Sequence, residues 1–213
     1  MYSADVKLSI MVGNGIFMVI EGLDGSGKTT QAKILAQRLS ETYSIYLTAE
    51  PSRGRVGTFI REHCLYDQLR LPTEAEALLF AADRIEHMQT ELKPALDQGK
   101  LVICDRYLYS SLAYQGSSGL NLEWIKSINA YAMQPDFSIF LDVPPEHVLE
   151  RLHRRRSVME TLEMQRKVRE VYLKFVEKGE LIVVDGDKPR EIVADELYTK
   201  ILDLLRPVKG YVS

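Results

Sequence analysis

The chain has 213 residues, 46% of them hydrophobic, which is enough to bury a full core in a single domain. Its net charge of −3 and pI of about 5.9 do not indicate a large nucleic-acid-binding face. We see no apolar run long enough to span a bilayer and no signal-peptide pattern in residues 1–15, so we expect a cytoplasmic protein without membrane association.

Along the chain, residues 1–15 are weakly patterned and are expected to form an N-terminal extension of unknown role, followed by one domain over 16–213. Short apolar runs predict strands over 16–21, 45–48, 101–104, 137–141 and 181–184. Segments of helical period predict helices over 27–42, 55–65, 73–98, 121–133, 145–153, 160–178 and 189–205. Pro94 lacks a backbone N–H and therefore predicts a kink or boundary. This alternation predicts a parallel α/β sheet with ligands at the carboxyl ends of its strands.

A glycine-rich segment joins the first predicted strand to the first predicted helix. Residues 22–29 read Gly-Leu-Asp-Gly-Ser-Gly-Lys-Thr, which matches the phosphate-loop pattern G-x-x-x-x-G-K-T. The glycines let backbone N–H groups curl around an anion, Lys28 supplies a positive charge, and the Thr29 hydroxyl suits Mg²⁺. An ordinary strand-to-helix turn is the alternative. The predicted nucleotide-binding residues here are Gly22, Asp24, Gly25, Ser26, Gly27, Lys28, Thr29 and Thr30.

Charged side chains also follow other predicted strands. Asp105 and Arg106 come directly after the strand 101–104, near the phosphate loop if the sheet is parallel. We interpret Asp105 as orienting a Mg²⁺-bound water and Arg106 as gripping a phosphate. The alternative is a surface loop with a solvated ion pair.

Four arginines, at 151, 154, 155 and 156, crowd the end of the predicted helix 145–153. Either they form a solvated basic helix end, or they belong to a lid that brings an arginine to a transferring phosphoryl group.

Five segments together resemble thymidylate (dTMP) kinase. They are the phosphate loop, Glu50-Pro51, Phe80-Ala-Ala-Asp-Arg84, the run Asp105-Arg-Tyr-x-x-Ser-Ser-x-Ala-Tyr-Gln-Gly116, and Leu141-Asp-Val-x-Pro-Glu146. The match covers about 16–205. It implies a P-loop nucleoside-monophosphate kinase with a three-layer α/β/α fold, a five-stranded parallel sheet and a short lid over about 151–162. The implied reaction moves the γ-phosphoryl group of ATP to dTMP, with Mg²⁺, in a homodimer.

The resemblance implies an acceptor site for dTMP. Asp24 would meet the 3′-OH side of the deoxyribose, Phe80 would stack on thymine, and Arg84 would hydrogen-bond the edge of the base. Tyr114 would crowd the sugar 2′ position, while Glu50, Ser111 and Gln115 complete the implied pocket. From the residues alone, an aromatic such as Phe80 in an amphipathic helix is more often a core side chain than a ligand platform, Tyr114 could equally be a packed side chain, and Asp83-Arg84 could be a surface couple.

The resemblance also implies the charges that act on the phosphates. Lys28, Arg106 and Arg155 are the expected catalytic residues, with Arg154 as the second lid candidate and Arg151 near the adenine. Thr29 and Asp105 are the expected Mg²⁺ ligands.

The chain departs from the family pattern in two places. Ala49 stands where many relatives have the arginine of R-E-P, and Arg53 or Arg55 could substitute for it. In the lid, Glu160-Thr-Leu-Glu163 replaces the usual D-R-x-E.

Two other readings remain open. The chain could act on another nucleoside monophosphate or a deoxynucleoside, or it could be a P-loop switch, although the guanine-reading N-K-x-D motif is not found.

Overall fold

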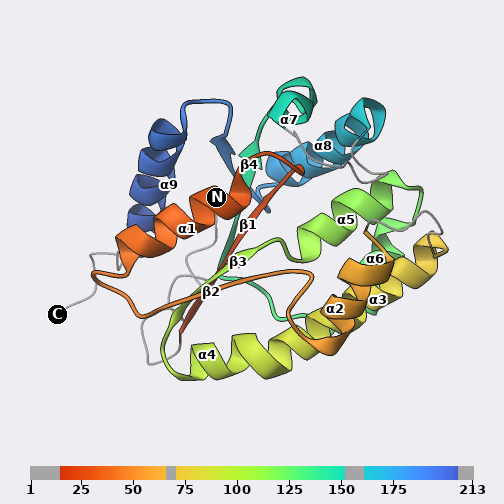
Figure 1. The fold of residues 1–213 in the computed structure, drawn as a ribbon, viewed down its shortest axis with the longest axis horizontal. Coiled ribbons are helices and arrows are strands. Elements are labelled where there is room, and N and C mark those ends of the chain that lie inside the picture. Colours follow the sequence, from red (N-terminus) through yellow and green to blue (C-terminus); the bar gives the residue numbers. More distant parts are fainter. Residues whose placement is uncertain (1–14, 66–70, 152–160, 206–213) are drawn as a thin grey trace.

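The computed structural model describes residues 15–65, 71–151 and 161–205. Five parallel strands form one sheet, as predicted, and their order is β2-β3-β1-β4-β5 (Figure 1). The strands are β1 (Ile16–Gly22), β2 (Ile45–Ala49), β3 (Leu101–Asp105), β4 (Phe137–Asp142) and β5 (Ile182–Asp185). The central position of β1 places the phosphate loop in the middle of the sheet's carboxyl edge.

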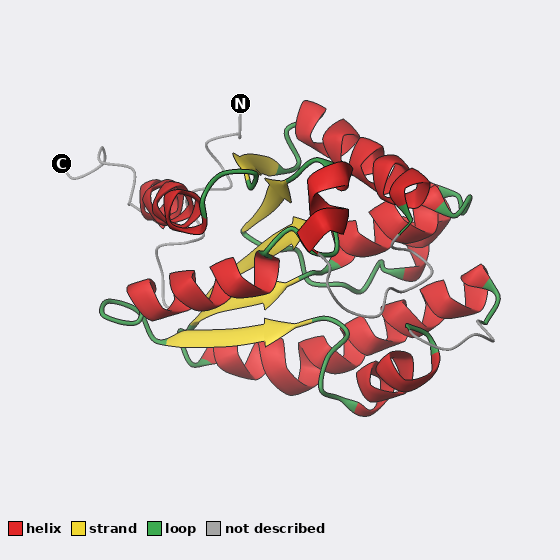
Figure 2. Ribbon diagram, turned by 45° about the horizontal axis from the view of Figure 1, so that its top comes forward, coloured by secondary structure: helices red, strands yellow, loops and turns green. Residues whose placement is uncertain are grey.

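Helices cover both faces of the sheet, which gives the predicted three layers (Figures 1 and 2). The helices α1 (Lys28–Leu39) and α9 (Arg190–Leu205) share one core with the sheet. On the other face lie α4 (Lys93–Asp97), α5 (Leu108–Ser117), α6 (Leu122–Ile128) and α8 (Leu162–Glu177). The remaining helices are α2 (Arg55–His63), α3 (Thr73–His87) and α7 (Pro145–Arg151).

The continuous apolar runs of the central strands follow from burial on both faces. Met18 and Ile20 pack toward α1 and α9, whereas Phe17 and Val19 pack into the opposite core. All four side chains are at most 1% exposed. Neither face of β1 therefore meets solvent, and its register with β3 and β4 is fixed from both sides.

Several predicted helix boundaries were wrong. The helix predicted over 121–133 ends at Ile128, and α5 was not predicted at all. The helix predicted over 73–98 is divided into α3, a π-helical turn over Met88–Leu92 and α4, so Pro94 does mark a boundary. A π turn directly before a proline adjusts the hydrogen-bond ladder where the N–H is missing.

Three further observations apply to the described residues. Their helices include none with the length and apolar content that a bilayer crossing needs. They hold no group of three or more His, Cys, Asp or Glu side chains suited to a metal ion. Cys64 and Cys104 are both buried and form no disulfide with each other or with another described residue.

Candidate active site

The phosphate loop leaves the end of β1 and opens onto a cavity at the N-terminus of α1. Gly25 and Gly27 have φ values of 85° and 94°, which glycine adopts without strain. The first turn of α1 contains no acidic residue, so its N–H groups and positive dipole end favour an anion. This loop cavity is lined by Asp24, Gly25, Gly27, Lys28, Thr29, Thr30, Ala49, Glu50, Asp105 and Arg106.

Lys28 is folded back over the loop that carries it. Its Nζ donates a hydrogen bond of 2.6 Å to the carbonyl of Leu23, and the side chain is buried. Burial, together with the nearby Arg106 charge, lowers the pKa of Lys28 to about 8. Lys28 is thus a poorly solvated cation, and a polyanion bound nearby would stabilise its charged form.

Thr29 and Asp105 meet across the loop cavity. The Thr29 hydroxyl donates a hydrogen bond of 2.5 Å to Oδ2 of Asp105. The other oxygen of this carboxylate, Oδ1, is buried and has no hydrogen-bond partner among the described residues. A hydroxyl and an unsatisfied carboxylate oxygen are hard donors of the kind that Mg²⁺ prefers, and Mg²⁺ commonly takes only one or two protein ligands.

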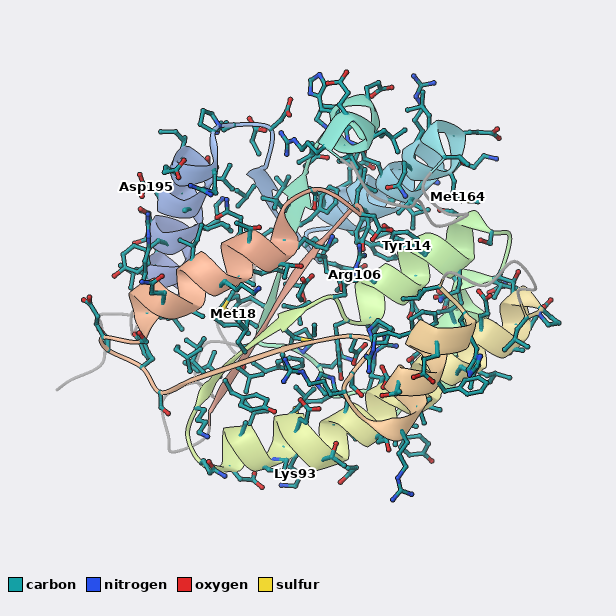
Figure 3. All side chains as sticks on the ribbon, viewed as in Figure 1. Met18, Lys93, Arg106, Tyr114, Met164 and Asp195 are labelled. Carbon is teal, nitrogen blue, oxygen red and sulfur yellow. The ribbon has the colours of Figure 1, made fainter. Side chains whose placement is uncertain are left out.

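Arg106 lies where the phosphate loop meets α5. Its Nη2 pairs with Oδ1 of Asp24 at 2.6 Å, and its Nη1 donates to the carbonyl of Gly22 at 3.1 Å. The guanidinium carbon is 5.2 Å from the centroid of the Tyr114 ring, and Figure 3 labels both residues. The Tyr114 hydroxyl bonds Oδ2 of Asp24 at 2.9 Å. Asp105 and Arg106 therefore face different partners, and the solvated ion pair considered from the sequence is wrong.

A second cavity, which we call the Phe80 cavity, lies between α3 and α5. Phe80, Arg84, Ser111 and Gln115, which the resemblance assigned to the base, and Tyr114, which it assigned to the sugar, all border this cavity. Phe80 is only partly buried and faces this space, so it is not simply a core side chain. The buried Oε1 of Gln115 has no hydrogen-bond partner among the described residues and could accept from a bound base.

Arg84 is held as a rigid fork at the bottom of this cavity. It is 1% exposed, and its Nε and Nη2 donate to Oε2 of Glu50 at 3.0 and 2.7 Å. Its Nη2 also donates to Ser111 at 3.1 Å, and its Nη1 donates to Asn129. His87 contacts the other oxygen of Glu50 at 3.2 Å. Sequence reasoning missed Asn129 and His87, although His87 follows Arg84 at helical spacing and could have been noticed.

The neighbouring Asp83 is also buried, so the surface couple considered for Asp83-Arg84 is wrong. Its carboxylate accepts from the backbone N–H of Ser52 at 2.8 Å and from the Ser52 hydroxyl at 2.5 Å. Burial raises the pKa of Asp83. This pair fixes the loop after the cis Glu50-Pro51 peptide bond to α3.

A third cavity, the Arg151 cavity, also borders the phosphate loop. Arg151 borders it together with residues of the loop, of α1, of the segment after β5 and of α9: Ser26, Gly27, Thr30, Gln31, Gly186, Lys188, Arg190 and Val193. Arg151 pairs with Asp187 at 2.9 Å. Sequence reasoning did not identify the segment after β5.

The lid arginines Arg154 and Arg155 lie outside the described residues, as does most of the predicted lid. Ala49, which departs from the R-E-P pattern of the resemblance, lines the loop cavity. Neither Arg53 nor Arg55 lines the loop cavity or the Phe80 cavity. Asp24, Glu50 and Arg106 line both of these cavities, so the two meet at one point.

Comparison with known proteins agrees with this arrangement. Residues 20–197 match the family described as thymidylate kinase. A probable thymidylate kinase of Pyrococcus abyssi is 52% identical over 171 residues, covering 76% of this chain and 83% of the relative. One from Thermococcus kodakarensis is 43% identical over 202 residues, covering 89% of this chain and 98% of the relative. The chain therefore belongs to the thymidylate kinase family.

Proposed function

We infer that this chain transfers the γ-phosphoryl group of ATP to dTMP, giving dTDP and ADP. The observation that carries this proposal is the meeting of the loop cavity with the Phe80 cavity at Asp24, Glu50 and Arg106. One cavity suits a polyphosphate and the other a flat base with polar edges. Their junction is where two phosphates must approach each other.

The donor would lie along the phosphate loop. We propose that the N–H groups of the loop and Lys28 hold its β- and γ-phosphates, while Arg151 and the segment after β5 border the base. The acceptor base would lie on Phe80, with Arg84 and Gln115 at its polar edge. Tyr114 and Asp24 would contact the sugar, and Arg106 the acceptor phosphate.

The chemistry is an in-line displacement at phosphorus. An oxygen of the dTMP phosphate bonds to the γ-phosphorus as the bond from that phosphorus to the β,γ-bridging oxygen breaks, and ADP leaves with the electron pair. The attacking oxygen is already ionised, so no general base is needed. The protein's contribution is positioning and charge: Lys28 and Arg106 reduce the repulsion between the two anions.

We propose that Thr29 and Asp105 hold a Mg²⁺ ion in the donor complex, on the strength of the unsatisfied Oδ1 of Asp105. The ion would neutralise charge on the β- and γ-phosphates. A chelator should abolish turnover, and added Mg²⁺ should restore it. Asp105→Asn should raise the Mg²⁺ concentration required for half-maximal rate; an unchanged requirement would exclude Asp105 as a ligand.

The test of the function is a product assay with ATP and a panel of acceptors. We expect dTDP from dTMP, weaker reaction with dUMP and dCMP, and little with the ribonucleotide of thymine because Tyr114 faces the sugar. A preference for another monophosphate or for a deoxynucleoside would move the chain to another kinase activity. Nucleotide binding without any transfer would support a P-loop switch instead.

Arg155 remains the predicted lid arginine. If it stabilises the transferring phosphoryl group, Arg155→Ala should lower kcat by up to roughly 10³-fold. A rise in the KM for ATP alone would make it a binding residue. The homodimer and the cytoplasmic location also stay predictions. The molar mass in solution would test the homodimer.

A further inference from the structure

Glu21, a fully buried carboxylate, lies behind the active site and lines none of the three cavities. It is the penultimate residue of β1, directly before the phosphate loop, and its side chain is 0% exposed. A buried charge of this kind is costly unless several donors satisfy it. Glu21 has no role in the reaction described above, so its buried charge needs another explanation.

Each oxygen of Glu21 accepts two hydrogen bonds. Oε1 accepts from the backbone N–H groups of Tyr107 and Ser110, at 3.0 and 3.2 Å. Oε2 accepts from the hydroxyls of Ser110 and Tyr172, at 2.6 and 3.0 Å. The pKa of Glu21 is raised, because the effect of burial outweighs that of these donors and of the Arg106 charge, which lower it. With donors on all four sites, the geometry is that of an ionised carboxylate.

The two backbone bonds make Glu21 the N-terminal cap of α5. This helix has no capping side chain of its own and no acidic residue in its first turn. A carboxylate at that position satisfies N–H groups that the helix leaves unpaired and interacts favourably with its dipole. The cap comes from a strand far away in sequence, so the start of α5 is fixed directly to β1.

One of the two hydroxyl bonds, that of Ser110, connects Glu21 to Arg106. The Ser110 hydroxyl donates to Glu21 and accepts from Nη1 of Arg106 at 3.1 Å, so it lies between the carboxylate and the guanidinium. Tyr172, from α8, lies 3.0 Å from the Ser110 hydroxyl and limits how it can turn.

The backbone of Arg106 needs this support. Arg106 has a φ of 73°, which a non-glycine residue adopts at a cost and keeps only where its surroundings hold it. Its own N–H donates to the carbonyl of Ile20 at 3.0 Å, and the next N–H, that of Tyr107, donates to Glu21. Both acceptors are neighbouring residues of β1, so the strained turn is fixed to the strand that also carries the phosphate loop.

We propose that Glu21 is a positioning residue: its buried carboxylate caps α5 and, through Ser110, fixes the guanidinium of Arg106 for the acceptor phosphate. The proposal rests on the proposed function for its choice of ligand. Glu21 touches no substrate. It sets the direction of a side chain that does, and it ties that side chain to the loop that holds the donor.

The substitution Glu21→Gln keeps the size but removes the charge. Whichever way the amide is turned, its NH₂ group replaces an acceptor with a donor, facing either the two N–H groups or the two hydroxyls. An NH₂ group facing the N–H groups removes the cap of α5, and one facing the hydroxyls makes Ser110 accept from the amide in competition with Arg106. We expect the dissociation constant for dTMP to rise about 10-fold or more, as for loss of one charge-assisted hydrogen bond. The KM for ATP should change by less than about 3-fold, since the ammonium and amides of the loop remain.

Thymidine, which lacks the phosphate, separates positioning of Arg106 from general loosening. Its affinity depends on the Phe80 cavity and should change by less than about 3-fold in Glu21→Gln. Calorimetric titration of the full chain with dTMP and with thymidine gives both affinities independently of turnover. Equal losses for the two ligands, or no loss for either, would overturn the proposal.

Asp136→Asn is the matched control. Asp136 is a partly buried carboxylate that accepts from the backbone N–H of Phe17 at 2.8 Å, at the opposite end of the same strand. The Asp136→Asn variant should have a lower thermal midpoint but an unchanged ratio of dTMP affinity to thymidine affinity.

If Glu21→Gln does not fold, Ser110→Ala decides the question, because it keeps both backbone bonds to Glu21 and removes the hydroxyl that contacts Arg106. An unchanged dTMP-to-thymidine affinity ratio in this variant would overturn the proposal. If both variants fold, their double mutant should cost no more than the larger single effect, since they interrupt one path. Failure of the wild-type chain to make dTDP would instead count against the proposed function, because the affinity ratio does not depend on turnover.

Discussion

At the scale of single residues, the positive charge of Lys28 favours the binding of anions in the site. It is buried beside Arg106, within a loop whose N–H groups also attract anions. Lys28→Ala should therefore lower kcat by about 10²-fold or more, because a positive charge aimed at the transferring group is lost. The fold should survive, which circular dichroism and the thermal midpoint would check. A kcat close to that of the wild type would remove Lys28 from the mechanism.

The lowered pKa of Lys28 predicts a pH dependence of a definite sign. Its ammonium loses a proton as the pH rises through about 8, so the free enzyme then loses the charge that attracts the donor phosphates. The kcat/KM for ATP should fall above this pH by about 10-fold per unit, since this ratio reports groups of the free enzyme. In Lys28→Arg the rate is lower but the alkaline decline is absent, because guanidinium does not titrate there. An equal decline in both proteins would assign it to another group.

Elements are stabilised at their ends by side chains of two kinds, local and distant. The helix α6 has a local cap: Oδ1 of Asn121 accepts from the N–H groups of Glu123 and Trp124 at 2.8 and 3.1 Å. Asn121→Ala should lower the free energy of unfolding by about 1 kcal/mol. Denaturant titration measures this, and the KM for dTMP should stay unchanged because the cap lies outside the Phe80 cavity.

The control for that cap is Lys126→Ala, which removes the exposed Glu123–Lys126 pair of the same helix and should change stability little. If the two variants were equally stable, the cap would contribute nothing beyond surface charge. The helix α5 differs because its cap, Glu21, comes from β1. Local sequence signals predict α6 but not α5, which explains why only α6 was expected.

The whole molecule depends on a sheet buried on both faces. Ile103 of β3 is 0% exposed and packs in the core shared with α1 and α9. Ile103→Ala should cost about 2–5 kcal/mol of unfolding free energy, through lost burial and the cavity left behind. Ile192→Ala, at a site 51% exposed on α9, should stay within about 0.5 kcal/mol. Similar losses in the two variants would contradict the layered core.

The sequence by itself determined the parallel α/β fold, its five strands and the phosphate loop. Those signals are local: a continuous apolar run such as 101–104 can only be buried on both sides, and glycines at 25 and 27 permit one kind of turn. Through the resemblance it also named Phe80, Arg84, Ser111, Tyr114 and Gln115, which all line the Phe80 cavity. Helix ends were less certain, because α6 stops at Ile128 without a glycine or a proline to mark the stop.

Only the tertiary structure decided which charges meet. From the sequence, Asp105-Arg106 and Asp83-Arg84 were adjacent pairs; in the fold each member has a different partner. Glu50 became the partner of Arg84, and Glu21 the cap of α5, across separations that no local pattern encodes. The physical reason is that the value of a charge depends on its burial and its neighbours. Here the burial and the neighbours of these charges are determined by how the tertiary structure brings the carboxyl ends of the strands together.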